Sequence, residues 1–303
     1  MATMTETPET VGTVTPTHEY HAKAHVLSGE LQRPIEQKIE QQAPVTLSDR
    51  RGGHLTRTEE DVSIEGLITY AKGYTRVSGS RSLKHNGWVT LSASIMEGLN
   101  VFEIITADRV VSQVSTDHAY DNGHFPRVTF LGTQFNNLRV SGFPVELKVN
   151  LDICGEKPAG GKSYLQDRAF LDAVRQQTEK IARASGLPKE LREQYDKKLT
   201  YVDELISASD IPDPGVHRPV TCSVVQSIGP IPIRGVQSFG HILVIPEFGT
   251  VSLGEVEVGE KQYEKDEKPC VYFTLTGVQA NLGCVGQGNT SAASSTANGR
   301  HNP

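Results

Sequence analysis

The stretch SRSLKHNGWVTLSASIM, residues Ser80–Met96, decides the fold class. Its Asn86-Gly87 pair is the strongest short signal for a tight β-hairpin, because both turn positions of that hairpin type need positive φ. After the turn, apolar and hydroxyl-bearing residues alternate with a period of two, which is the side-chain period of a strand. This pattern predicts a half-buried antiparallel strand. Its two faces carry Val89, Leu91, Ala93 and Ile95 on one side and Trp88, Thr90, Ser92 and Ser94 on the other.

Further strand patterns follow this hairpin. The segment NVFEIITADRVVSQVST (Asn100–Thr116) is rich in β-branched residues, and FPVELKVNLDIC (Phe143–Cys154) alternates apolar and polar residues without a break. Strand candidates separated by Gly and Pro return between residues 216 and 285. These patterns predict antiparallel strands with one face toward a core.

The period changes between residues 162 and 207. Apolar residues recur at helical spacing in two successive segments, and only Gln177 interrupts the first apolar stripe. Gly186 suits the end of the first helix, and Pro188 suits the first turn of the second. On the exposed side, Arg175 and Glu179 have the spacing of an ion pair on one helix. We therefore predict an α-helical hairpin.

Strands on both sides of a helical segment predict a mainly β fold. The expected architecture is an antiparallel β-sandwich, or a related two-layer sheet, with an inserted α-helical hairpin. Two β domains joined by a helical linker are the alternative. The predicted divisions are a disordered arm (1–17), a first β part (18–158), the hairpin with its linkers (159–215), a second β part (216–285) and a disordered tail (286–303).

The composition argues against several classes of protein. With 303 residues, 37% of them hydrophobic and 22% charged, the chain is long and apolar enough to bury a core. A formal net charge of −6 argues against nucleic acid as a partner. No apolar run reaches the length of a membrane helix, and the first residues lack the basic and apolar regions of a secretory signal. We expect a cytoplasmic protein, with a surface location as the alternative.

The cysteines carry no metal or redox motif. None of the four lies in a CxxC pair, so their spacing predicts no zinc knuckle. Without an export signal, reduced and buried thiols are expected. The four are Cys154, Cys222, Cys270 and Cys284.

The segment GEKPAGGKS (Gly155–Ser163) resembles a nucleotide-binding P-loop only at its end. Five residues separate Gly155 from Gly161, where a P-loop has four. The preceding strand alternates, whereas a P-loop strand is buried on both faces. We expect no nucleotide, and we interpret the segment as a lead-in to the helix with Ser163 as an N-cap.

A polar loop offers candidate metal ligands. In TDHAYDNGHFP, residues 116–126, two imidazoles and two carboxylates occur within eight positions of one another. Their spacing allows both histidines and a carboxylate to meet one ion. The alternative is an ordinary polar loop with an Asx turn. The candidate ligands are Asp117, His118, Asp121 and His124.

Two aromatic residues are candidates for ligand binding. Trp88 and Tyr120 are predicted to form part of an exposed platform, as in carbohydrate-binding sandwiches, unless Trp88 instead covers the hairpin that it begins. HEYHAKAH also contains three histidines. On a helix the three share a face and suit a metal, whereas on a strand His21 and His25 share a face that excludes His18.

The segments ITADRVVSQVST and VTFLGTQFNNLRVSGFPVEL, within Ile105–Leu147, resemble a strand pattern of bacterial choice-of-anchor β proteins. The matching positions are structural residues such as Leu138, Val140, Gly142 and Pro144. The whole chain also resembles an uncharacterised bacterial family of β-rich proteins with the same helical insertion. The resemblance implies a β scaffold and assigns no activity or cofactor.

Together these patterns predict a non-enzymatic β-rich protein that acts by binding or assembly. The alternative is a metal-dependent enzyme that uses the His118–His124 loop. A protein partner, or a second copy of the chain, is expected to dock on the helical hairpin. No residue pattern identifies a cofactor or the ligand.

Overall fold

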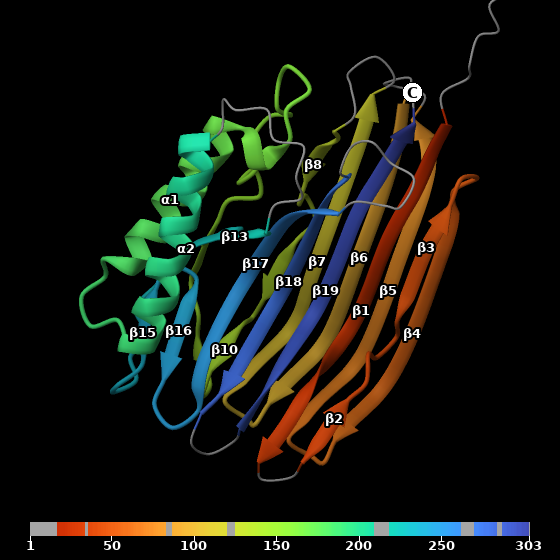
Figure 1. Cartoon of the computed structure of the whole chain (residues 1–303). Coiled ribbons are helices and arrows are strands. Elements are labelled where there is room, and N and C mark those ends of the chain that lie inside the picture. The colour runs from red at the N-terminus through yellow and green to blue at the C-terminus, as the bar shows by residue number, and fades with distance from the viewer. Residues whose placement is uncertain are drawn as a thin grey trace, which may run out of the picture.

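The structure, a computed structural model, describes residues 17–33, 36–82, 87–119, 125–208, 218–261, 270–283 and 287–302. Antiparallel strands form two large sheets that face one another, as a sandwich (Figure 1). The prediction of a mainly β fold with an inserted pair of helices is therefore confirmed.

Sheet A has nine strands. They are β1 (Thr17–Arg33), β2 (Gln37–Ile39), β3 (Val45–Asp49), β13 (Val220–Ser223), β15 (Gln237–Phe239), β16 (Ile242–Ile245), β17 (Gly249–Lys261), β18 (Cys270–Leu282) and β19 (Gln287–Asn302). The main path runs β15-β16-β17-β18-β19-β1-β2, with β13 paired to β17 and β3 paired to β1. Strands from both β parts of the chain thus share one sheet, so the two parts form one sandwich.

Sheet B has eight strands from the first β part. They are β4 (Gly53–Ile64), β5 (Ile68–Ser82), β6 (Gly87–Val101), β7 (Ile105–Ala119), β8 (Arg127–Thr129), β9 (Gln134–Asn136), β10 (Arg139–Val140) and β11 (Phe143–Pro144). The path runs β11-β10-β7-β6-β5-β4, and β8 and β9 also pair with β7. A separate pair joins β12 (Leu147–Val149) to β14 (Val225–Ile228).

The predicted continuous strand over Phe143–Cys154 is wrong. The alternation is real, but only β11 and β12 are strands there, and Val149 is 39% exposed. Of these two, β11 lies at the edge of sheet B beside β10, whereas β12 leaves sheet B and pairs with β14. Alternation alone does not show whether a neighbouring strand is present, which is what a strand needs.

The predicted disordered tail at 286–303 is also wrong for residues 287–302. They form β19, which pairs with β1 on one side and with β18 on the other. Its small residues suit this position because the two sheets lie close together. Ala293, Ser295 and Ala297 are fully buried, and the Ser295 hydroxyl donates to the Ser112 carbonyl of sheet B at 2.8 Å.

The sandwich interior is lined in part by hydroxyl groups. On β6 the hydroxyl-bearing face, and not the Val89–Leu91 face, points to sheet A. Ser92 donates to the Lys23 carbonyl at 2.7 Å, and Ser94 donates to the His25 carbonyl at 2.8 Å. Both serines are fully buried. These bonds satisfy the buried hydroxyls and tie the sheets together.

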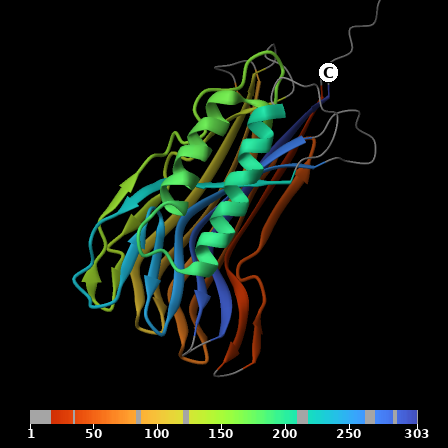
Figure 2. The same ribbon diagram turned by 60° about the vertical axis from the view of Figure 1, so that its left-hand side comes forward.

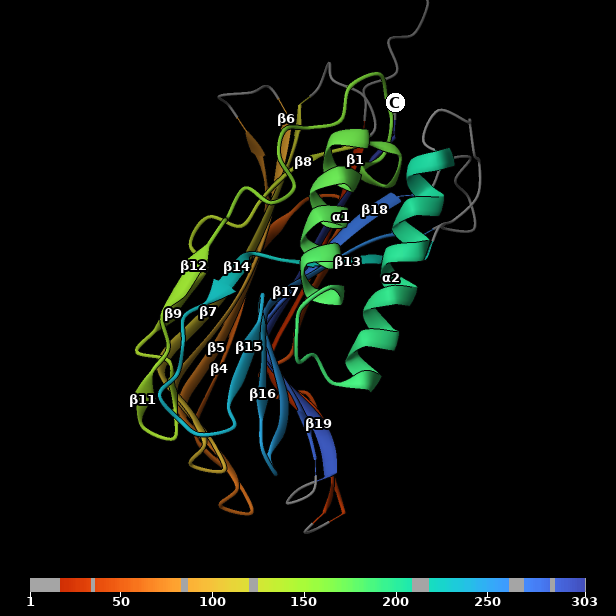
Figure 3. The same cartoon turned by 90° about the vertical axis from the view of Figure 1, so that its left-hand side faces the viewer.

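Two helices cover one side of the sandwich. A short 3-10 turn, η1 (Tyr164–Gln166), leads to α1 (Arg168–Ala182), and α2 (Lys189–Ala208) follows. Figures 2 and 3 show the helices next to each other on the side where β13 and β16 lie. Their apolar stripes enter the main core through Phe170, Leu171, Val174, Val202 and Leu205.

The ends of the helices follow the predicted signals, with one shift. Gly186 has a φ of 78°, as expected between the helices, and Pro188 directly precedes α2. Ser163 is the N-cap of η1 rather than of α1. The side chain of Asp167 caps α1 by accepting a hydrogen bond from the Phe170 amide at 2.9 Å.

The polar residue in the α1 stripe binds the sheet backbone. The side-chain Nε2 of Gln177 donates to the backbone carbonyl of Ser223 at 2.9 Å, and the backbone N–H of Ser223 donates to the side-chain Oε1 of Gln177 at 2.7 Å. The Gln177 side chain therefore makes the two hydrogen bonds to the Ser223 backbone that a neighbouring strand would make. This explains why a polar residue occupies the buried face of α1.

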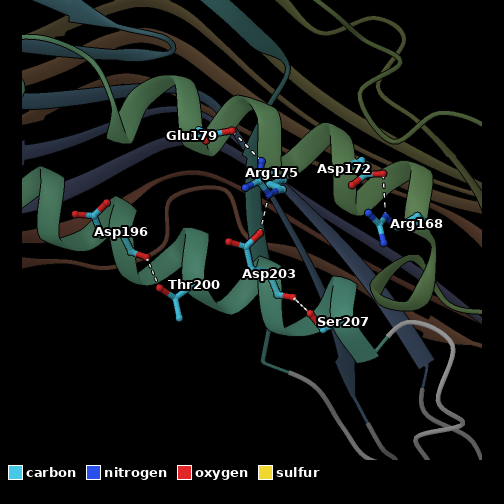
Figure 4. Close-up of polar contacts among 8 residues, drawn as sticks. All are labelled: Arg168, Asp172, Arg175, Glu179, Asp196, Thr200, Asp203 and Ser207. Carbon is cyan, nitrogen blue, oxygen red and sulfur yellow. Dashed lines mark hydrogen bonds and ion pairs between the residues drawn. The ribbon is translucent and has the colours of Figure 1, made fainter.

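Ion pairs lie on the solvent-facing side of the helical hairpin that α1 and α2 form (Figure 4). Arg175 binds Glu179 on its own helix at 2.8 Å, as predicted, and Asp203 on α2 at 2.7 Å. Arg168 binds Asp172 at 3.0 Å. The apolar stripes face the core, so the solvent face of the hairpin is polar.

Candidate functional site

The predicted metal ligands do not share a face where the structure describes them. Asp117 and His118 are neighbours on β7, so their side chains point to opposite sides of sheet B. His118 is fully buried between the sheets. Tyr120, Asp121 and His124 lie outside the described residues. Among the residues that the structure describes, no group of three or more His, Cys, Asp or Glu side chains is placed to hold a metal ion.

Trp88 is buried where the two sheets pack together and does not form an exposed platform. It is 5% exposed and stacks on His18 of β1, with ring centroids 5.1 Å apart. His18 also contacts His118 edge-on at 4.8 Å and Tyr20 at 4.6 Å. The three histidines of HEYHAKAH divide as a strand predicts, since His18 points inward and His21 lies on the outer face.

The outer face of sheet A carries a groove of about 530 Å³. Strands β3, β1, β19, β18 and β17 form its floor, and hydroxyl-bearing and charged side chains predominate among its residues. The groove is lined by His21, Ala22, Lys23, Thr46, Leu47, Ser48, Lys261, Tyr272, Thr274 and Thr296.

Strand register arranges polar side chains in one row across the groove. The row consists of residues directly opposite one another on the five strands, in the order Thr46, Lys23, Thr296, Thr274 and Glu257. Because neighbouring strands lie about 4.8 Å apart, the row spans roughly 19 Å. We call it the polar row.

Tyr272 lies beside the polar row in a fixed orientation. It is directly opposite Gly259 on β17, where a Cβ atom would come within 2.5 Å of the tyrosine Cζ. The Tyr272 hydroxyl donates to Glu257 Oε1 at 2.9 Å. Burial, together with this bond to a carboxylate, raises the pKa of Tyr272 to about 12. The missing side chain at Gly259 thus lets the ring cross β17 next to the sheet.

Further hydrogen bonds order the floor of the groove. The hydroxyls of Thr274 and Thr296 are 2.9 Å apart, and Ser48 Oγ is 3.1 Å from His21 Nδ1. His21 Nε2 is also 3.8 Å from a carboxylate oxygen of Glu19. The groove therefore presents donors and acceptors whose positions are set by a sheet.

Sequence reasoning missed this groove. One signal for it was available in HEYHAKAH, because strand alternation places Lys23 on the same face as His21. Three members of the polar row, Thr296, Thr274 and Glu257, come from strands more than 200 residues away from Lys23 in the chain. No local pattern shows that these strands are neighbours.

A family comparison places the chain. The model of a family described as Domain of unknown function (DUF8256) matches residues 18–259, more than three quarters of the chain. The chain belongs to the DUF8256 family. The expected membership of an uncharacterised family is confirmed. No match to the DUF8256 chain was found among the curated proteins or the solved structures.

The family match ends before β18 and β19. Both strands lie between β17 and β1 in the DUF8256 chain, so the matched region and the two later strands complete sheet A together. Two members of the polar row, Thr274 and Thr296, therefore lie beyond the matched residues.

Within the described residues, no helix has the length and apolar character needed to cross a membrane.

A second polar cluster lies between α2 and sheet A. The Tyr195 hydroxyl is 3.3 Å from His241 Nε2, and the Lys198 ammonium lies 4.8 Å from the centre of the Tyr195 ring. Burial, with a contribution from Lys198, lowers the pKa of His241 to about 3. Burial also raises the pKa of the Glu255 carboxyl. His241 is 2% exposed, so this cluster is part of the helix–sheet packing.

The described cysteines are buried free thiols, as expected, while Cys284 lies outside the described residues. Burial raises the pKa of Cys222 to about 12 and that of Cys270 to about 11. Burial also raises the pKa of Cys154 well above its ordinary value. Nucleophilic cysteines need the opposite shift, so none of these three has the properties of a catalytic thiol.

Proposed function

We propose that the DUF8256 chain is a non-catalytic binding protein that takes a polar ligand in the groove on the outer face of sheet A. The observation that supports this most is the polar row. Four of its members, Thr46, Lys23, Thr296 and Thr274, place ammonium and hydroxyl groups in one hollow of about 530 Å³, and Glu257 continues the row on β17. Pockets of this size with a few fixed polar groups are typical of small-ligand sites.

The groove is suited to binding because its groups are already in place. The strands hold the backbone, and the hydroxyls of Thr274 and Thr296 form a hydrogen bond with each other. Tyr272 is held between Gly259 and the Glu257 carboxylate. A ligand therefore orders few side chains when it binds, which lowers the entropic cost of association.

The carboxylates around the groove argue for binding rather than glycoside hydrolysis. Glu19 is on β1 and Glu257 is on β17, three strand spacings away in sheet A. The spacing across the strands alone is roughly 14 Å, and Glu19 is displaced a further four residues along β1 from Lys23, the residue in register with Glu257. Carboxylate pairs in glycosidases are about 5–10 Å apart. Glu257 also accepts the Tyr272 hydroxyl in the free protein.

The hairpin offers a different kind of surface. Its apolar stripes face the core and its outward face carries ion pairs such as Arg175–Asp203. A partner that docks on the hairpin would therefore meet charges that are already paired, and surface ion pairs contribute little binding energy. The groove is the stronger candidate.

A thermal-shift screen tests the proposed function without assuming the ligand class. The full chain is heated with cellohexaose, hexagalacturonate, AMP or glutathione, each at millimolar concentration. At least one probe is expected to raise the melting temperature, because a ligand that binds only the folded state stabilises it.

Two triple variants locate the binding site. A Lys23→Gln, Thr274→Val, Tyr272→Ala variant is expected to lose the shift. A control of Thr58→Val, Lys148→Gln, Tyr74→Ala, on β4, β12 and β5, is expected to keep it. A shift that survives in the first variant places the ligand elsewhere. The absence of a shift with all four probes contradicts the proposal.

A further inference from the structure

We infer that the ligand of the groove is a neutral oligosaccharide. This inference rests on the proposed function and adds the chemical class. Three features carry it: the mixture of donors and acceptors in the polar row, the balance of charge around it, and the fixed Tyr272 ring beside it.

The polar row matches the hydrogen bonding of sugar hydroxyls. Each sugar hydroxyl both donates and accepts, so a complementary surface must offer both functions. Lys23 supplies donors only, Glu257 supplies acceptors only, and the threonine hydroxyls between them supply both. Across the sheet, the Thr296 and Thr274 hydroxyls lie between Lys23 on one side and Glu257 on the other.

The charges around the groove favour a neutral ligand. Two lysines, Lys23 and Lys261, lie at the groove, and two carboxylates, Glu19 and Glu257, flank it. A phosphate or polyanion site instead concentrates cations or backbone N–H groups without neighbouring carboxylates. An anionic ligand at the polar row would meet the carboxylate of Glu257.

The floor of the groove disfavours a peptide. Extended peptides bind sheets by pairing with free backbone groups of an edge strand. The strands at the centre of this floor, β1, β19 and β18, each have a neighbouring strand on both sides. The centre of the floor therefore offers side chains only, which suits a ligand recognised through its own hydroxyls.

Tyr272 supplies the apolar part of the site. Its ring crosses Gly259 beside the sheet, and the half-buried residue lines the groove. An aromatic face with its hydroxyl already bonded offers flat, rigid, partly apolar contact area, which matches the C–H face of a sugar ring.

The spacing of these groups indicates more than one sugar unit. Tyr272 is on β18 and Lys23 is on β1, with β19 between them. Two strand spacings correspond to about 10 Å, which exceeds the width of a single sugar ring. A ligand that reaches both residues is therefore an oligosaccharide.

Titration calorimetry on the full chain tests the class. The neutral probes are cellohexaose, xylohexaose and mannohexaose, and the anionic probe is hexagalacturonate. We expect at least one neutral hexasaccharide to bind and hexagalacturonate to bind at least tenfold more weakly. If hexagalacturonate binds more tightly than the neutral probes, or if only AMP or glutathione raises the melting temperature in the thermal-shift screen, the inference of a neutral saccharide is wrong while the proposed function stands.

Matched variants link saccharide binding to the polar row. Thr274→Val removes a hydroxyl and keeps the shape, and is expected to weaken binding of the neutral probe about tenfold, which is the effect of one hydrogen bond of roughly 1.4 kcal/mol. Thr58→Val on β4 is the control and should leave affinity unchanged. Equal affinities for the two variants, with both melting temperatures unchanged, would overturn the inference.

Discussion

Gly259 determines the position of the Tyr272 ring in the groove. Any side chain there would overlap the Tyr272 ring, since a Cβ atom would be 2.5 Å from Cζ. An aromatic residue placed across a strand glycine covers the exposed backbone and fixes its own rotamer. The position of Tyr272 is thus set by the absence of an atom on the neighbouring strand.

We predict that Gly259→Ala displaces Tyr272 and weakens binding of the neutral hexasaccharide at least tenfold in calorimetry. The methyl group leaves no room for the ring end. It should also lower the free energy of unfolding, by roughly 1–3 kcal/mol for an overpacked site. In a Tyr272→Ala background the same substitution should cost little, because the clash is gone. An unchanged cost there would contradict the proposed contact.

Acid is predicted to destabilise the protein through His241. Burial holds its pKa at about 3 in the folded state, while an unfolded histidine titrates near 6.5. The unfolded chain therefore binds the proton first, so stability is present above pH 6.5 and is lost as pH falls toward 3. Between pH 7 and pH 4 the loss from this residue is on the order of 3 kcal/mol.

Urea unfolding at pH 7 and pH 4 measures this effect. His241→Gln should lose less stability on acidification than the unmodified protein, and His54→Gln, at an exposed site on β4, should lose the same amount as the unmodified protein. Glu255 acts in the opposite sense, because burial raises its pKa and protonation then favours the folded state. The comparison between variants isolates His241. If all three proteins lost the same free energy of unfolding between pH 7 and pH 4, the burial of His241 would not control acid stability.

At the scale of elements, composition misleads most at β19. Its run of Ser, Thr, Ala, Gly and Asn has the low hydrophobicity of a disordered tail. The strand nevertheless lies at the centre of sheet A, because closely spaced sheets need small side chains between them and Ser295 bonds across the gap. Helix signals were more reliable, since Gly186 and Pro188 mark real helix ends and Gln177 has an explicit partner in Ser223.

Deleting residues 287–303 is predicted to abolish folding. Without β19, both β1 and β18 lose a neighbouring strand over most of their length. The expected result is an insoluble chain, or one without a cooperative thermal transition in circular dichroism. The milder Ser295→Ala should fold and lose about 1 kcal/mol, since one buried hydrogen bond is removed. A truncated protein that melts like the full chain would contradict the central role of β19.

Gln177→Leu is predicted to destabilise the hairpin attachment by about 2 kcal/mol or more. The leucine leaves the N–H and carbonyl of Ser223 without the bonds that Gln177 provides. Gln176→Leu, on the exposed side of the same helix, is the control and should change stability by less than about 0.5 kcal/mol. Chemical denaturation of the two variants measures the difference. Equal values would show that water replaces these bonds at no cost.

At the scale of the whole molecule, periodicity was enough to predict the sandwich and the inserted helices. It was not enough to predict the site, because the polar row joins positions as distant as Thr46 and Thr274. Strand order is a long-range property, and a one-sequence pattern reports only which residues of one strand share a face. Thus strand alternation relates Lys23 to His21 on β1, but it does not identify their neighbours on β18 and β19.

Removing the hairpin, residues 164–208, is predicted to unfold the whole protein. The side chains of Phe170, Leu171 and Val174 belong to the same core as the strands of both sheets. Because α1 and α2 contact β13 and η1 contacts β17, their loss would expose apolar surface on these two strands. Limited proteolysis and circular dichroism of the deletion variant test this. A stable, soluble sandwich after deletion would show that the hairpin is an independent attachment.

The hydroxyl-to-carbonyl bonds between the sheets have a mechanical consequence. Apolar layers resist separation but slide past one another easily, because the hydrophobic effect has no preferred direction. Ser92, Ser94 and Ser295 instead fix specific points of one sheet to specific points of the other. Resistance to shear is thereby built into the middle of the protein. The positions of β1 and β19, and with them the floor of the groove, are held from behind by sheet B.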